Sequence, residues 1–112
     1  MESTGTVHNI FHLNKEKKFS EDQAYELVNL FHAITSKSKV KINGHNSRLD
    51  FYKAQPELAD NVQFELNTEI QKWSEKVRRL GGVPLSLYKV KIPASEGHFT
   101  WEFPSSDIEY SL

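Results

Sequence analysis

The chain has 112 residues, of which 38% are hydrophobic and 26% are charged, and its formal net charge is −1. This length is typical of one domain with one core. The near-zero net charge provides no overall attraction to nucleic-acid phosphates, which are bound by clustered Lys and Arg. Because the sequence contains no cysteine, disulfides, thiolate metal sites and a cysteine nucleophile are excluded.

The N-terminal region is polar at first and then weakly alternating. Residues 1–6 are polar and are predicted to be a flexible tail. They lack the basic start and apolar run of a secretion signal. Val7 to Leu13 alternates enough to predict a short strand. No apolar stretch approaches the roughly 20 residues that span a bilayer. We therefore expect a cytoplasmic protein that does not associate with a membrane.

A first helix is predicted over residues 19–37. Ser20 and Gln23 have the spacing of a capping box, in which each side chain bonds the backbone of the other. An apolar stripe then follows at steps of three and four residues, formed by Ala24, Leu27, Val28, Phe31 and Ile34. The polar run that starts at Thr35 predicts the end of this helix. Asn43-Gly44 favours a tight turn in the connection that follows.

A second helix is predicted over residues 47–80, and Pro56 leaves its start open. Either a helix that begins at Ser47 is kinked near Pro56, or the helix starts at Pro56, where proline is tolerated in a first turn. Its apolar seam is formed by Leu58, Val62, Leu66, Ile70, Trp73, Val77 and Leu80. Gly81-Gly82 predicts its end. Two helices joined by a loop are expected to pack antiparallel.

The C-terminal region, residues 85–112, is predicted to be a three-stranded meander. Its expected strands are 85–92, 98–103 and 108–112. In the middle strand Phe99, Trp101 and Phe103 alternate with polar residues, so one face is apolar and needs a covering layer. The fold class is therefore predicted as α+β, with two long antiparallel helices on a small antiparallel sheet, to which the N-terminal strand could add.

Several motifs occur in a recognisable order: Phe19-Ser20-Glu21-Asp22-Gln23-Ala24, Leu80-Gly81-Gly82-Val83, Val90-Lys91-Ile92-Pro93-Ala94, Phe99-Thr100-Trp101 and Ile108-Glu109-Tyr110. From Phe19 to the C-terminus the chain resembles a family of bacterial domains of unknown function. It departs from the family pattern at Lys91, where an aspartate is usual, and at Thr100, where a cysteine is usual. The resemblance implies the architecture, and it implies no mechanism because the family has no established activity.

The polar face of the middle strand is the candidate ligand site. Alternation places His98, Thr100 and Glu102 together on the side away from the predicted core. A histidine and a carboxylate there could bind a polar ligand or act as acid and base, but an ordinary solvent-facing strand is the simpler interpretation. His8 and His12 would lie about 13 Å apart on a strand. No metal site, cofactor or catalytic residue is therefore predicted.

A basic cluster surrounds the predicted connection between the helices. It is formed by Lys37, Lys39, Lys41, Arg48 and Lys53. These residues make a nucleic-acid accessory protein a third interpretation, although solvation of a loop explains them without a partner, and the sequence argues against nucleic-acid binding.

Three apolar residues lie off the main stripes of the helices. Tyr25 and Leu30 on the first helix and Phe64 on the second could pair two copies into a four-helix arrangement. We therefore expect a non-catalytic homodimeric binding or interaction module with an unidentified protein or small-molecule partner. A small-molecule-binding protein or enzyme that uses residues 98–102 is the alternative.

Overall fold

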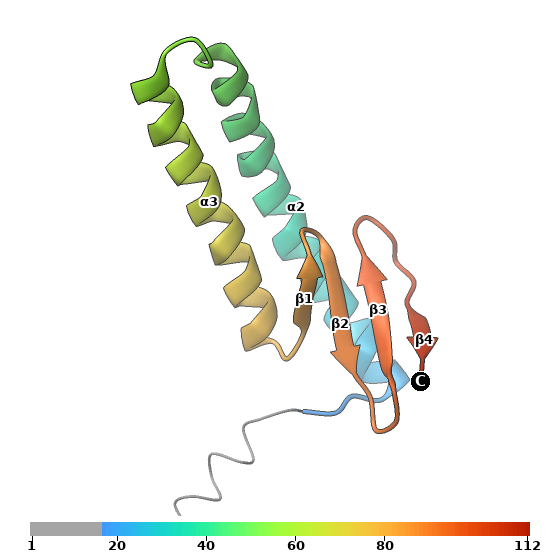
Figure 1. Ribbon diagram of the computed structural model, residues 1–112. Coiled ribbons are helices and arrows are strands. Elements are labelled where there is room, and N and C mark those ends of the chain that lie inside the picture. The colour runs from blue at the N-terminus through green and yellow to red at the C-terminus, as the bar shows by residue number, and fades with distance from the viewer. Residues whose placement is uncertain (1–16) are drawn as a thin grey trace, which may run out of the picture.

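A computed structural model describes residues 17–112 and shows a helical hairpin followed by a sheet (Figure 1). The elements in chain order are α2 (Glu21–Phe51), α3 (Pro56–Arg79), β1 (Val83–Ser86), β2 (Lys89–Pro93), β3 (His98–Glu102) and β4 (Glu109–Ser111). This arrangement confirms the α+β prediction. The predicted tail over residues 1–6 and the predicted strand from Val7 to Leu13 lie outside the described residues.

Helix α2 begins where the sequence predicts. The Ser20 hydroxyl accepts a 3.2 Å hydrogen bond from the backbone N–H of Gln23. The Gln23 side chain accepts one of 2.9 Å from the backbone N–H of Ser20. Both halves of the capping box are present, and Glu21 and Asp22 lie in the first turn, at the positive end of the helix dipole.

Helix α2 continues to Phe51, so the predicted end at residue 37 is wrong. Thr35 and Ser38, which weaken the pattern in the sequence, are buried. They continue the buried stripe to Ile42 at the three- and four-residue steps of a helix seam. The turn predicted at Asn43-Gly44 is also wrong, because helical backbone runs through both residues. Packing along the seam outweighs the local preference of these residues for a turn.

Helix α3 begins at Pro56, which decides between the two starts that the sequence left open. Residues 47–51 belong to α2, and a short connection over 52–55 separates the helices. Proline at the start of α3 loses no intrahelical bond. At the other end Gly81 has a φ of 102°, the left-handed geometry that the Gly-Gly pair predicts.

The sheet has four strands in the order β1-β2-β3-β4, all antiparallel. The predicted strand over 85–92 is divided by a turn at Leu87 and Tyr88, whose φ of 71° reverses the chain. Val90 pairs with Trp101 and Lys91 pairs with Thr100 across β2 and β3. The other two predicted strands correspond to β3 and β4, so a four-stranded meander replaces the predicted three-stranded one.

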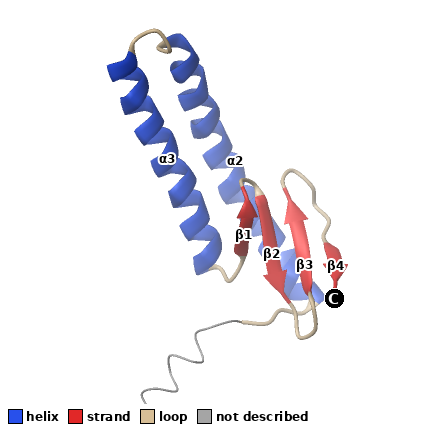
Figure 2. Ribbon diagram, in the orientation of Figure 1, coloured by secondary structure: helices blue, strands red, loops and turns tan. Residues whose placement is uncertain are grey.

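The core lies where the first half of α2 meets the sheet. Its buried members are Ala24, Leu27, Val28, Phe31, Trp73, Val77, Val90, Ile92, Ala94, Phe99 and Trp101. Figure 2 shows that the hairpin runs well past the sheet. At about 1.5 Å per residue, α2 is much longer than strands of three to five residues. Within residues 17–112, neither helix combines the length and apolarity that crossing a membrane requires.

Candidate functional site

The outer face of β3 presents the three polar residues that the sequence singled out. His98 and Thr100 are half-buried and Glu102 is exposed, whereas Phe99 and Trp101 between them are buried in the core. The alternation therefore places the three side chains on one face, as expected. Pairing puts Thr100 between Lys91 of β2 and Glu109 of β4, and it puts Glu102 opposite Lys89.

A hollow of about 540 Å³ lies on this outer face. It is lined by Leu85, Lys89, Thr100, Glu102, Phe103, Pro104, Ser105, Asp107 and Glu109. Thr100 and Glu102 therefore reach one hollow, and His98 does not. Three carboxylates face one lysine there, so the lining would favour a ligand that carries a positive charge or several hydrogen-bond donors.

An aromatic cluster that the sequence did not predict covers one end of the core. Tyr88 lies 6.1 Å from Trp73 and 6.0 Å from Phe103, measured between ring centroids. The Lys39 ammonium lies 5.3 Å from the Phe103 ring centre and 6.0 Å from that of Tyr88, within cation–π range. His32 packs on Phe103 at 4.9 Å. Burial raises the pKa of the Tyr88 hydroxyl above its usual value.

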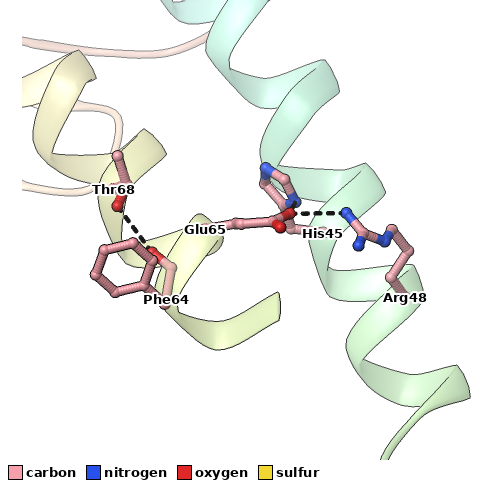
Figure 3. Close-up of polar contacts among 5 residues, drawn as sticks. All are labelled: His45, Arg48, Phe64, Glu65 and Thr68. Atoms are coloured by element: carbon pink, nitrogen blue, oxygen red, sulfur yellow. Dashed lines mark hydrogen bonds and ion pairs between the residues drawn. The ribbon is translucent and has the colours of Figure 1, made fainter. Parts of the chain in front are cut away.

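The projecting part of the hairpin carries a polar contact between its two helices (Figure 3). Glu65 points toward α2 and accepts a 2.9 Å hydrogen bond from Arg48. His45 Nδ1 lies 3.7 Å from the same carboxylate. That buried nitrogen makes no hydrogen bond within the described part of the chain. Because the Arg48 pair is exposed, it contributes at most about 1 kcal/mol.

The three predicted dimer residues do not gather into one strip. Tyr25 and Leu30 are 38% and 49% exposed, but their five-residue separation turns them about 140° apart around α2. Phe64 lies beside Glu65, level with Arg48, which is about 35 Å along the hairpin from Tyr25. Figure 3 shows Phe64 pointing away from α2. The three residues therefore occupy separate positions on the hairpin.

The basic cluster is also divided by the fold. Lys39 contacts the aromatic cluster, while Arg48 bonds Glu65 farther along the helix. Lys37 and Lys41 are each two residues from Lys39, so they point about 160° away from it around α2. Lys53 lies in the connection between the helices. The helical fold therefore distributes the predicted cluster over different faces and levels of α2 and the connection that follows it.

Lys37 and Lys41 line a groove between the helices on the side opposite Lys39. Its volume is about 300 Å³, and its other lining residues are Ser38, Val40, Glu69 and Lys76. Glu69 is only 7% exposed, although the sequence pattern assigned the seam position to Ile70. Among residues 17–112, Glu69 has no hydrogen bond or ion pair.

Residues 17–112 contain no group of three or more His, Asp or Glu side chains arranged to hold a metal ion. Comparison of the chain with protein-family models, with curated proteins and with solved structures gives no match.

Proposed function

We propose that the protein is a non-catalytic homodimeric interaction module in which two copies associate along α2. The observation that supports this proposal is an exposed, uncharged stripe along α2, formed by Val40, Gly44, Ser47 and Phe51. All four residues are exposed, and Val40 and Phe51 reach 72% and 76%. Their steps of four, three and four residues keep them on one face of the helix.

The stripe is symmetric in a way that suits a twofold axis. Val40 and Phe51 are equally far from the midpoint between His45 and Asn46, and so are Gly44 and Ser47. Two antiparallel copies of α2 that cross at this midpoint would place Val40 against the partner's Phe51. They would also place Gly44 against the partner's Ser47. A self-complementary patch of this kind is what an isologous interface requires.

Gly44 supports the same arrangement. A glycine inside a helix costs about 0.5–1 kcal/mol relative to alanine. A Cβ atom added at Gly44 would have no neighbour within 4 Å, so packing within the chain does not require glycine there. Close approach of a second helix does favour a residue without a side chain. The stripe covers only about three turns, so we expect a dimer that dissociates on dilution.

Two phenylalanines with nearly equal exposure test the proposal. Phe51 is 76% exposed and belongs to the stripe, whereas Phe64 is 73% exposed and lies on α3. In light scattering over a concentration series, wild type should shift from monomer to dimer. Phe51→Ser should remain monomeric, and Phe64→Ser should dimerise like wild type. A monomeric wild type would refute the homodimer, and loss of dimer in Phe64→Ser alone would place the interface on α3.

A small-molecule-binding protein remains the second candidate, and the hollow beside Thr100 and Glu102 favours it. Its lining combines three carboxylates with the apolar side chains of Leu85, Phe103 and Pro104. A small cation such as an alkylammonium is the suitable probe. Glu102→Gln should weaken saturable binding of butylammonium, measured by NMR titration, while His98→Gln should not. Equal binding by Glu102→Gln and wild type would remove this candidate.

A further inference from the structure

The groove between Lys37, Lys41 and Lys76, which we call the lysine groove, is also lined by the carboxylate residue Glu69. Glu69 is only 7% exposed as a residue. No described group donates to it. Its carboxylate oxygens are still accessible, because His45 Nδ1 is the one buried side-chain nitrogen or oxygen atom of residues 17–112 that lacks a hydrogen bond. A ligand that donates a hydrogen bond to Glu69 would supply the missing partner.

The lysines define the other half of the ligand. Two helical neighbours on α2, Lys37 and Lys41, face Lys76 from α3 across the groove, and all three are exposed at their ends. By formal charge, the lining carries three lysines and one glutamate, a net charge of +2. A phosphate monoester carries about −1.5 to −2 charges at pH 7. An amino-acid zwitterion, with no net charge, would leave the lysines unbalanced.

We infer that the lysine groove binds a small phosphate monoester that carries a free hydroxyl group. The phosphate accepts hydrogen bonds from the lysine ammonium groups, and the hydroxyl donates to the Glu69 carboxylate. The Ser38 side chain, which is 2% exposed, provides a further polar group at the base of the groove. A volume of about 300 Å³ suits a ligand of this size. The groove shares Val40 with the proposed dimer stripe, whereas Phe51 does not line it, so Phe51→Ser tests the dimer without changing the groove.

Two ligands of equal charge and similar size separate the contribution of Glu69. Glycerol 3-phosphate has two hydroxyl groups, and n-propyl phosphate has none. In NMR titrations of the full chain, wild type should bind glycerol 3-phosphate about tenfold more tightly, the size expected for one hydrogen bond to a charged group. Glu69→Met has similar length without an acceptor oxygen. It should reduce this ratio to about one and should strengthen binding of n-propyl phosphate, because a negative charge is removed.

A matched pair of lysines on α3 tests the phosphate contact. Lys76 lines the groove, whereas Lys72, one turn away and also exposed, does not. Lys76→Met should weaken both ligands several-fold and preserve their ratio, while Lys72→Met should bind like wild type. Phe51→Ser should also bind normally, which keeps this result separate from the dimer test.

Three results would overturn the inference. The first is equal binding of the two phosphates by wild type, or no saturable binding of either. The second is tighter binding of the zwitterion γ-aminobutyrate than of glycerol 3-phosphate. The third is an equal effect of Lys72→Met and Lys76→Met. If Glu69→Met fails to fold, as judged by circular dichroism, the ligand preference of wild type and the lysine pair still decide the question.

Discussion

The indole N–H of Trp73 on α3 donates a 2.7 Å hydrogen bond to the Thr35 hydroxyl on α2, and both side chains are buried. Thr35→Val keeps the shape of the side chain and leaves the buried N–H without an acceptor. We expect the free energy of unfolding to fall by about 1–3 kcal/mol, measured by urea denaturation. Thr35→Ser keeps the hydroxyl and serves as the control. Equal stability of Thr35→Val and wild type would contradict this role.

Substitution by alanine should have opposite effects on the free energy of unfolding at Gly81 and at Gly44. Gly81 has a φ of 102°, and an added Cβ would lie 2.6 Å from a carbon of the Phe19 ring. Gly81→Ala should therefore lower the free energy of unfolding by about 1–2 kcal/mol.

Gly44 is helical, and an added Cβ would meet no atom within 4 Å. Gly44→Ala should raise the free energy of unfolding by about 0.5–1 kcal/mol when measured on dilute monomer. The same substitution should weaken the proposed dimer at higher concentration. A destabilised Gly44→Ala monomer would show that the glycine has a role within the chain.

Lys39 and Lys37 allow the cation–π contact to be measured separately from helix charge. The Lys39 ammonium lies 5.3 Å from the ring centre of Phe103, whereas Lys37 lines the lysine groove. Lys39→Met should lower thermal stability by about 0.5–1 kcal/mol, as expected for an exposed cation–π pair. Lys37→Met should leave it nearly unchanged. The contact has no energetic role if both variants melt alike.

Ionisation of Tyr88 should lower the free energy of unfolding at alkaline pH. Burial raises the pKa of its hydroxyl above the usual value of 10.0, so the folded state holds the proton more tightly than the unfolded state. The resulting stabilisation is fully present below that usual value and is lost as the pH rises through the raised pKa. When the pH is raised from neutral to alkaline, the urea midpoint should therefore decrease more for wild type than for Tyr88→Phe. Parallel curves would exclude Tyr88 as the cause.

Local sequence signals predicted the parts of the fold that depend on residues close together in the sequence. The capping box at Ser20, the glycine at position 81 and the alternation through Trp101 all correspond to the structure. The predicted end of α2 at residue 37 was wrong because Thr35 and Ser38 resemble helix-ending residues in the sequence. Their burial against α3, and the bond from Trp73, exist only once the hairpin has formed.

The candidate sites were less accessible to sequence reasoning. Alternation grouped Thr100 with Glu102, but the hollow beside them also needs the loop that carries Pro104 and Asp107. The sequence showed the basic cluster as a local concentration of Lys and Arg. Its division between Lys39 and the lysine groove follows from helical backbone through residues that favour a turn. Glu69 looked like one acid on a solvated face, and nothing in its local pattern indicates its burial.

The projecting hairpin should exchange its amide hydrogens as a unit separate from the rest of the protein. Beyond the sheet, its buried apolar residues are Ile42, Val62 and Leu66, and none of them joins the main core cluster. Regions with few buried apolar contacts open at a lower free energy than the core. Amides near Gly44 should therefore exchange well before those near Phe31, so the tip can open and close again while the sheet stays folded.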